Sequence, residues 1–244
     1  MRVPHIYQAS DIALNTPISL NDDAAGHISR VLRMKVGEKI SLFNGQGGEF
    51  LSEISEITKK SVVVLPIEYI DHNAESPLKV HLGQCISRGD KMDFTIQKSV
   101  ELGVNEITPI FSQRCGVKLN ADRLDKKHQQ WQKIAISAAE QSGRNAVTVI
   151  HPPIDLQTWL EQTSTEIKLT LHPRAEHSIK TIIVPDAGVR FLIGPEGGFT
   201  DEEMLNTKQQ EFVDIRLGPR VLRTETAALT VLSALQLQFG DLAN

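Results

Sequence analysis

The sequence predicts an α/β protein in which a mainly parallel sheet, covered by helices on both faces, follows a small β-barrel. From Leu78 onward, apolar runs of strand length alternate with segments of helical periodicity, which is typical of parallel sheets. Before that point, alternating and β-branched runs surround one helical segment, which is typical of a small barrel. The polar segment Asp71–Pro77 indicates a linker, so we expect domains at residues 1–72 and 73–244.

The N-terminal part contains one expected helix and three expected strands. Asn21 or Asp22 begins the helix, because both residue types cap helices. The apolar residues that recur at helical spacing after this start are Ala25, Ile28, Val31 and Leu32. The expected strands are the runs KISLFNG, EFLSEISEI and SVVVLPIEYI, at residues 39–45, 49–57 and 61–70.

The C-terminal part alternates between expected strands and expected helices. The strands are the apolar runs at residues 79–87, 106–111, 147–152, 166–173, 189–194 and 213–218. We expect helices between Asp90 and Gly103, at 156–160, from Asp201, and through Phe239 at the end of the chain. A further, long helix carries Leu124, His128, Trp131, Ala135 and Ala138 on one face. Parallel sheets bind ligands outside the carboxyl ends of their strands. Three strand ends are therefore candidate sites: Leu171–Pro173, Gly194–Glu196 and Leu217–Pro219.

A glycine-rich loop follows one of these strands in FLIGPEGGFTDEE, residues 191–203. Thr200 and Glu203 form a capping-box pattern, so a helix begins directly after the loop. Three carboxylates lie at this helix start, where each exposed acid contributes roughly 0.3–1 kcal/mol, and they would repel a phosphate. The glycine-rich patterns G-x-x-x-x-G-K-[ST] and G-x-G-x-x-G, which mark nucleotide-binding loops, are also absent. We therefore expect a flat heterocycle or a neutral or cationic group as ligand; the alternative is a tight turn that binds nothing.

The composition limits the classes of function. The chain is 40% apolar and 23% charged, as in an ordinary soluble protein, and no apolar run is long enough to cross a membrane. Cys85 and Cys115 have no C-x-x-C partner, and the N-terminus has no secretory signal, so we expect a cytoplasmic protein without disulfides. The eight histidines show no ligand spacing, so we expect no metal.

Basic residues at two places are candidates for RNA contact. Arg30, Arg33 and Lys35 lie within two helical turns, and Arg30 and Arg33 share a face of the expected helix. Arg88 and Lys91 could extend this basic surface. The alternative is a solvated basic face that binds nothing. Because the formal net charge is −4, RNA binding would need such a local patch or docking on a preassembled particle.

The stretch LGPRVLRTETAALTVLSALQ, residues 217–236, joins a strand end to an apolar helix. A helix that is apolar on nearly all sides is buried, either in the domain core or in a subunit interface. Core packing explains the leucines, but it does not explain why Arg220, Arg223 and Glu225 lie beside them.

Five long motifs together resemble the RsmE family: HISRVLRMKVGEKISLFNG, FTIQKSVELGVNEITPIFSQRCGVKL, WQKIAISAAEQSGRN, LIGPEGGFTDEE and LGPRVLRTETAAL. The resemblance runs from the first residues to Gly240. It implies S-adenosylmethionine-dependent methylation of N3 of one uracil in 16S ribosomal RNA. It also implies a SPOUT-class C-terminal domain with a parallel sheet and a trefoil knot, a PUA-like N-terminal β-barrel, and a homodimer.

The resemblance further implies a cofactor pocket built by three loops. Its residues would be Leu171, His172, Pro173, Ile193, Gly194, Pro195, Glu196, Gly197, Gly198, Leu217, Gly218, Val221, Leu222, Arg223 and Thr224. Methylation also requires that the uracil N3 proton is removed or that the uracil anion is stabilised. Glu225 and Glu196 are the candidate bases, and Arg223 and Arg144 are the candidate stabilisers. For each of the four, a structural salt bridge is the alternative.

Three other functions stay open on the sequence alone. A related enzyme of the same fold could methylate another position, such as a ribose 2′-hydroxyl. A non-catalytic ribosome-assembly factor could keep the fold, although the intact IGPEGG and LGPRVLRTETA stretches weigh against it. A nucleotide-dependent dehydrogenase is disfavoured because the G-x-G-x-x-G pattern is absent. The modest net acidity favours the assembled small ribosomal subunit over free RNA as the substrate.

Overall fold

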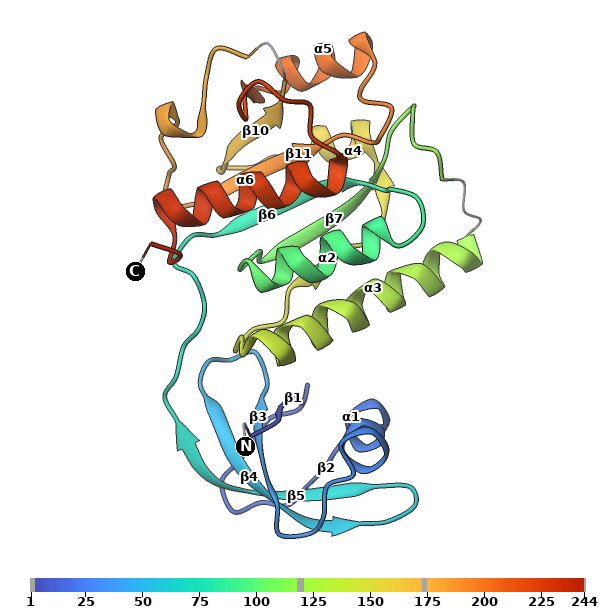
Figure 1. Cartoon of the computed structure of the whole chain (residues 1–244), viewed down its shortest axis with the longest axis vertical. Helices are drawn as coiled ribbons and strands as arrows, with labels where there is room; N and C mark the ends of the chain where they lie inside the picture. The colour runs from blue at the N-terminus through green and yellow to red at the C-terminus, as the bar shows by residue number, and fades with distance from the viewer. Residues whose placement is uncertain (1–2, 118–120, 173–174, 244) are drawn as a thin grey trace. The chain divides into compact units, whose positions relative to one another are not determined.

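A computed structural model describes residues 3–117, 121–172 and 175–243, and the chain divides into two compact units (Figure 1). One unit contains the residues up to Glu75 together with Ala139–Val147, and the other contains Ser76–Ala138 and the residues from Thr148 onward. The inclusion of Ala139–Val147 in the first unit is not evident from the sequence. No helix in the described ranges combines the length and apolar character that a membrane span requires.

The first unit is built on a five-stranded sheet with the order β1-β3-β4-β5-β2. Its strands are β1 His5–Tyr7, β2 Ile18–Ser19, β3 Lys39–Phe43, β4 Glu49–Ile57 and β5 Val62–Ile70. β1 pairs with β3 in parallel, and the other pairs are antiparallel. The three predicted strands are confirmed, and the core beneath them contains Ile28, Ile40, Leu42 and Ile54.

The predicted helix of this unit begins as expected but is irregular. Asn21 caps α1 (Asp22–Gly26), because its side-chain oxygen accepts a hydrogen bond from the backbone N–H of Ala24 at 2.9 Å. The chain then continues as a π-helix, η1 (His27–Leu32), and Arg33 ends it in the left-handed conformation with φ of 54°.

The π-helix changes which side chains are buried. A π-turn holds more residues than an α-turn, so the spacing of an α-helix no longer identifies the inner face. Ile28 is fully buried, whereas Val31 is 68% exposed and Leu32 is 40% exposed. Arg30 and Arg33 do not share a helical face, since Arg33 lies beyond the last residue of the helix.

The second unit contains a parallel sheet with the strand order β12-β10-β11-β6-β7-β8, and β9 pairs with β7. Its strands are β6 Val80–Cys85, β7 Glu106–Phe111, β8 Val149–Ile150, β9 Ile154–Asp155, β10 Ile167–Leu171, β11 Val189–Ile193 and β12 Val213–Ile215. Each pairing among them is parallel, as the sequence predicts. Every residue of β11 is buried, in keeping with a sheet covered on both faces.

The helices of the C-terminal part are α2 Lys91–Glu101, α3 Ala121–Ser142, α4 Leu156–Leu160, the short 3-10 helix η2 Ile179–Thr181, α5 Asp201–Gln209 and α6 Thr224–Phe239. α2 and α6 pack side by side (Figure 1). Asp90 precedes α2 as expected, but its side chain makes no capping hydrogen bond.

Two neighbouring residues of β6 show that α4 and α6 cover opposite faces of the sheet. Successive side chains of a strand point to opposite faces. Gln84 donates a hydrogen bond to Thr224 at the start of α6. Gly83 instead faces Trp159 of α4, and an added Cβ atom would come within 2.6 Å of that ring. Glycine at position 83 therefore allows α4 to pack directly on the sheet.

Candidate functional site

A cavity of about 470 Å³, here called the strand-end cavity, lies at the carboxyl ends of β10, β11 and β12. β10 pairs with both β11 and β12, so the three strand ends are neighbours in the sheet. The ends that the sequence analysis identified therefore meet around one space, as expected for a parallel sheet. Its volume is in the range of small-molecule sites.

Most of the predicted cofactor residues line the strand-end cavity. Those that do are Leu171, His172, Ile193, Gly194, Pro195, Glu196, Gly197, Gly198, Leu217, Gly218, Val221, Leu222 and Thr224. Arg223 does not line it, and Pro173 lies outside the described residues. The lining also includes residues that the sequence analysis did not assign: Phe199, Asp201, Met204, Ile215, Arg216, Arg220 and Ala227. Phe199, Asp201, Arg220 and Ala227 lie inside the quoted motifs, and Met204, Ile215 and Arg216 lie next to them, which is the signal that could have found all seven.

The glycine-rich loop has a conformation that requires its glycines. Gly198 adopts a φ of +65°, which favours glycine. A Cβ atom at Gly194 would approach the Phe199 ring to 3.0 Å. Arg114 holds the loop from outside, because its Nη1 donates to the carbonyl oxygens of Gly197 at 3.1 Å and Phe199 at 3.3 Å. No sequence pattern indicates this role, since Arg114 is distant from the loop along the chain.

The helix after the loop begins with the predicted capping box. Thr200 accepts a hydrogen bond from the Glu203 N–H at 3.2 Å, and the Glu203 carboxylate accepts one from the Thr200 N–H at 2.8 Å. Glu203 is 5% exposed, and its second oxygen accepts the Gln113 N–H at 2.7 Å. The start of α5 is therefore already satisfied by the protein, which leaves little reason for a phosphate to bind there.

A buried hydrogen-bond chain joins the sheet, α6 and the glycine loop. The Gln84 side-chain amide donates to the Thr224 hydroxyl at 2.9 Å, and Thr224 donates to the carbonyl oxygen of Gly194 at 2.7 Å. Gln84 is fully buried and Thr224 is 6% exposed. Because both residues are shielded from water, each lost bond would leave an unsatisfied polar group.

Of the two candidate bases, Glu196 is already engaged. It lines the cavity, pairs with Lys91 Nζ at 3.2 Å and accepts the Arg88 N–H at 3.4 Å. Burial opposes its charge, but hydrogen bonds from its own backbone, Lys91 and Arg88 outweigh burial and lower the pKa of Glu196. A carboxylate with a lowered pKa is a weaker base, so this environment disfavours Glu196 as a proton acceptor.

Arg223 and Glu225 lie on either side of Thr224 at the start of α6. Arg223 is exposed to solvent, and Glu225 is half-buried. The Glu225 Oε2 atom is buried and has no hydrogen-bond partner among the described residues. Like Arg223, Glu225 does not line the strand-end cavity. A buried carboxylate oxygen without a donor is costly, which favours uptake of a proton by this atom.

Arg144 is placed differently from the other three candidates. It belongs to the first unit and is 4% exposed. Its guanidinium binds both carboxylate oxygens of Glu75, with Nε at 3.2 and 3.1 Å from them. The Arg144 carbonyl oxygen lies 3.0 Å from Nε2 of His5. These contacts correspond to the structural salt bridge that the sequence analysis left as the alternative.

The predicted basic residues of the first unit are exposed. Arg30, Arg33 and Lys35 all face solvent. Arg30 also lines a groove of about 470 Å³, together with Asp22 and with Lys59 and Lys60 from the turn between β4 and β5. This lysine pair was not among the predicted RNA contacts, although two lysines between two expected strands could have indicated it.

The predicted basic residues of the second unit lie beside the strand-end cavity. Lys91 pairs with Glu196, and the Arg88 Nε donates to the carbonyl oxygen of Gly116 at 3.2 Å. Both side chains are therefore partly engaged within the protein and less available to RNA than Arg30, Arg33 and Lys35.

Two known families match the chain. Residues 74–236 match the family described as RNA methyltransferase domain, and residues 20–67 match the family described as RNA methyltransferase PUA domain. Among curated proteins, the ribosomal RNA small subunit methyltransferase E of Buchnera aphidicola (subsp. Schizaphis graminum) is 42% identical over 243 residues and 99% of each chain. The Bacillus subtilis protein of the same name is 35% identical over 229 residues and 90% of each chain.

Solved structures agree with these matches. A methyltransferase of Legionella pneumophila in complex with the bound cofactor SAM has a TM-score of 0.95 and 43% identity, over 99% of this chain and 100% of that chain. The ribosomal RNA small subunit methyltransferase E of Neisseria gonorrhoeae, bound to S-adenosyl methionine, has a TM-score of 0.93 and 36% identity over the same shares. The parallel sheet with a PUA-like N-terminal domain is thereby confirmed, and the chain belongs to the ribosomal RNA small subunit methyltransferase E family.

Proposed function

We propose that the protein transfers the methyl group of S-adenosylmethionine to N3 of one uracil in 16S ribosomal RNA. The observation that carries this proposal is the strand-end cavity, in a chain that matches cofactor-bound relatives over nearly its whole length. The family name specifies small-subunit ribosomal RNA, and the resemblance in the motifs specifies the uracil nitrogen.

The strand-end cavity fits the cofactor chemically. The adenosyl group carries no phosphate, and the start of α5 is satisfied by its own capping box. Leu217 and Leu222 offer apolar contact to a flat heterocycle, and the glycines allow the backbone to come close to it. The lining carries charges of both signs, with Glu196 and Asp201 on one side of the balance and Arg216 and Arg220 on the other, so the fit rests on the apolar contacts and the close backbone. When bound, S-adenosylmethionine supplies an electrophilic methyl group.

The residues at the start of α6 would handle the proton of the uracil N3. We assign the general base to Glu225, because its Oε2 lacks a partner whereas Glu196 is held by Lys91. The exposed Arg223 next to it would stabilise negative charge on the uracil as the proton leaves. Arg144 has no part in this assignment, since its charge is matched by Glu75.

The first unit would bind the RNA. Arg30, Lys59 and Lys60 surround one groove, so their charges can neutralise neighbouring phosphates. Val31 and Leu32 next to Arg30 are also exposed and offer apolar contact to a partner beside the groove. This patch gives a protein of net charge −4 a local basic surface, and the overall acidity favours docking on the assembled small subunit.

Several finer features belong to the same proposal. We expect a homodimer, supported by the 88% exposed Val221 at the cavity and the 56% exposed Leu237 on α6, because exposed apolar side chains often mark interfaces. We also propose that the C-terminal domain contains a trefoil knot, that the domain boundary follows residue 72, and that the protein is located in the cytoplasm.

Complementation tests the proposal in cells. The chain would be expressed in a bacterial strain that lacks 3-methyluridine in its 16S RNA. Methylation at N3 blocks Watson–Crick pairing, so reverse transcription of the RNA should stop at one uridine when the protein is present. A strain carrying the Gly198→Ala variant should show a weaker stop. Read-through at every uridine with well-expressed wild-type protein would contradict the proposal.

A further inference from the structure

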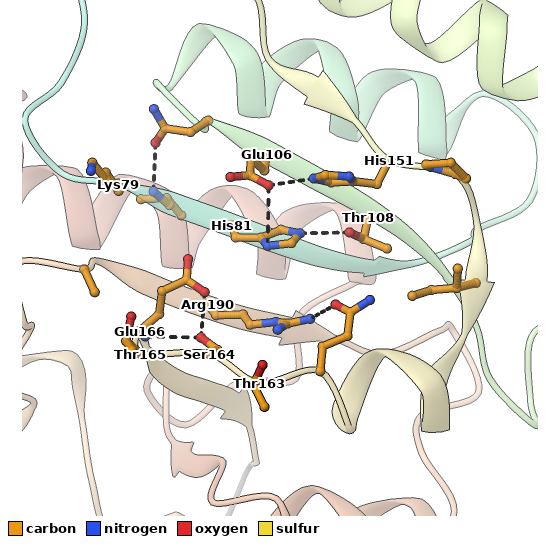
Figure 2. Close-up of a pocket in the computed structure, with 16 residues that line it drawn as sticks. Lys79, His81, Glu106, Thr108, His151, Thr163, Ser164, Thr165, Glu166 and Arg190 are labelled. Atoms are coloured by element: carbon orange, nitrogen blue, oxygen red, sulfur yellow. Dashed lines mark hydrogen bonds and ion pairs between the residues drawn. The ribbon is translucent and has the colours of Figure 1, made fainter.

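A second cavity, of about 1070 Å³, lies at the other end of the parallel sheet (Figure 2). We call it the amino-end cavity, because it opens beside the first residues of β6, β7 and β11. His81 is the second residue of β6, Glu106 is the first of β7, and His151 directly follows the short β8. All strands of the sheet run in one direction, so this edge is opposite to the strand-end cavity. The two linings share no residue.

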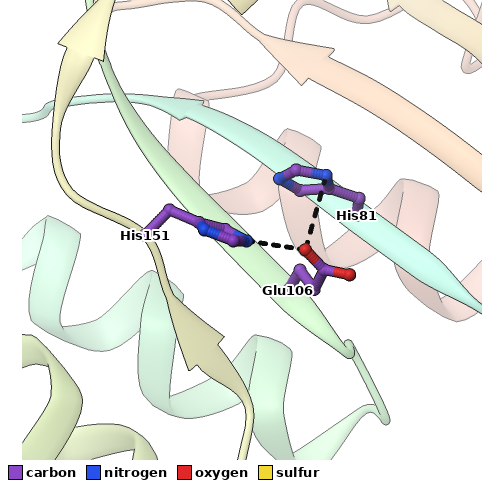
Figure 3. A group of neighbouring side chains, drawn as sticks. All are labelled: His81, Glu106 and His151. Atoms are coloured by element: carbon purple, nitrogen blue, oxygen red, sulfur yellow. Dashed lines mark hydrogen bonds and ion pairs between the residues drawn. The ribbon is translucent and has the colours of Figure 1, made fainter. Parts of the chain in front are cut away.

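The register of the sheet brings His81, Glu106 and His151 together (Figure 3). His81 pairs directly with Glu106 across β6 and β7. The backbone N–H of His151 donates to the Ile107 carbonyl oxygen at 2.9 Å, which fixes the segment after β8 beside Glu106. One ligand-type atom from each of the three side chains lies within 4.8 Å of the others. Three separate segments of the chain therefore supply one cluster.

The polar contacts within the cluster leave acceptor atoms facing one another. The Glu106 Oε2 atom is 2.6 Å from His151 Nε2 and 4.0 Å from His81 Nδ1. His81 Nε2 lies 2.8 Å from the Thr108 hydroxyl. In the tautomer in which Nε2 donates to Thr108, the Nδ1 lone pair of His81 faces the Glu106 carboxylate. A cation between these two acceptors would be favoured.

His81 is the least exposed member of the cluster. Its side chain is 12% exposed, compared with 46% for Glu106 and 37% for His151, and its ring packs against Trp159 in a T-shaped arrangement.

We propose that His81, Glu106 and His151 form a binding site for a divalent transition-metal ion, with zinc as the best-fitting ion. Two imidazoles and one carboxylate are a zinc ligand set that leaves a fourth position open. Magnesium and calcium prefer sites built from oxygen alone. The open position would face the amino-end cavity, where water or a small ligand can occupy it.

Small side-chain movements are sufficient to close the site. Tetrahedral zinc with ligand bonds of about 2.0–2.2 Å needs ligand atoms about 3.3 Å apart. The Glu106 and His151 side chains are 46% and 37% exposed, so both can rotate towards the buried His81. Binding would replace the proton between His151 and Glu106, as metal binding commonly does.

Other charges face the same cavity. Arg190 lies opposite His81 in the register of β11 and β6, and its positive charge opposes the binding of a cation. Its Nη2 donates hydrogen bonds to the Trp159 carbonyl oxygen and to the Gln162 side-chain oxygen. Lys79 also opposes a cation, whereas Glu166 favours one. These charges predict a site of moderate rather than extreme affinity.

The position of the proposed zinc site indicates a structural role and not a role in methyl transfer. An ion there would join β6, β7 and the segment after β8, and it would be remote from the strand-end cavity at the other edge of the sheet. Zinc should therefore raise the Tm, by about 5–10 °C at a hundredfold excess over Kd, and leave the methylation rate unchanged. The three ligands come from separate segments of the chain, so histidine spacing along one segment did not indicate a metal site.

Zinc binding to metal-stripped protein tests the proposal. Equilibrium dialysis followed by elemental analysis should give one zinc per chain for the wild type and for His72→Ala, a control at an exposed histidine. His151→Ala and Glu106→Gln should bind zinc at least about 100-fold more weakly, because each loses a ligand. Equal zinc affinity in all four proteins, or no zinc retained by the wild type, would overturn the site.

Two further variants separate ligation from folding and from charge. Thr108→Val keeps all three ligands but removes the hydroxyl that orients His81, and affinity should fall about 10–100-fold. Glu166→Gln removes a negative charge from the same cavity and should lower affinity much less than Glu106→Gln. Circular dichroism and Tm without metal identify any variant that fails to fold. Equal losses of zinc affinity in Glu166→Gln and Glu106→Gln would contradict direct ligation.

Cobalt substitution gives a spectroscopic test of the same site. An intense visible absorption spectrum in the cobalt-loaded wild type that is absent in His151→Ala would support the site.

Discussion

Thr224 donates a hydrogen bond to the carbonyl oxygen of Gly194 at 2.7 Å and thereby ties the start of α6 to the glycine loop. The same hydroxyl accepts a bond from the buried Gln84, so its position is fixed from the sheet as well. Two walls of the strand-end cavity are held together through this one side chain. The shape of the cavity should therefore depend on Thr224 more than on other residues of α6.

Thr224→Val should weaken binding of S-adenosylmethionine at least about fivefold. The substitution keeps the volume but leaves Gly194 and Gln84 with unsatisfied polar atoms, which costs about 1–3 kcal/mol. Isothermal titration calorimetry measures the change. Thr226→Val is the matched control, because Thr226 is exposed on the same helical turn. Identical Kd values for the two variants would show that the hydrogen-bond chain has no role in cofactor binding.

Gly198→Ala should both destabilise the protein and weaken cofactor binding. Gly198 has a φ of +65°, where a Cβ atom costs roughly 1–2 kcal/mol, so the Tm should fall by about 2–8 °C. Gly47→Ala is the control, since Gly47 has a φ of +91° and also has open space around it. Both variants should lose stability, but only Gly198→Ala should raise the Kd for S-adenosylmethionine. A similar Kd in both would remove the loop from the site.

Glu225→Gln should lower the rate of methylation by roughly 100-fold and leave the Kd for S-adenosylmethionine unchanged, because a general base acts only in the chemical step. Single-turnover kinetics with saturating subunits measures that step. Glu196→Gln serves as the comparison, and its effect on the rate should be smaller, since Glu196 is paired with Lys91. If Glu196→Gln proved the more damaging of the two, the base would have to be reassigned.

Arg30→Ala, Lys59→Ala and Lys60→Ala should each raise the KM for the ribosomal subunit without changing cofactor affinity. Each removes a positive charge beside the groove of the first unit, so the dependence of binding on salt should also become shallower. Lys126→Ala, at an exposed position of α3, is the control. Unchanged KM and salt dependence in all three variants would place the RNA-binding surface elsewhere.

The strand-end cavity could be predicted because it follows from a general property of parallel sheets. Strand runs such as 189–194 are recognisable from apolar residues alone, and ligands bind where such strands end. The capping box of Thr200 and Glu203 is likewise local, so its pattern was sufficient. Each of these features depends only on residues close together in the sequence.

Other features depend on contacts that no local pattern contains. Arg114 holds the glycine loop, and Ala139–Val147 joins the first unit, through contacts between distant segments. The π-helix η1 changed the buried face of a segment whose spacing predicted an α-helix. The approach of His81 to His151 requires the strand order, which periodicity does not specify.

The most direct test of the assigned reaction identifies the methylated nucleoside. The protein would be incubated with methyl-labelled S-adenosylmethionine and small ribosomal subunits from a strain that lacks the modification, and the digested RNA would be analysed by chromatography and mass spectrometry. The proposal predicts label in 3-methyluridine alone, and much less label with Glu225→Gln. Label in a 2′-O-methylated or other nucleoside, or no label while the cofactor still binds, would contradict it.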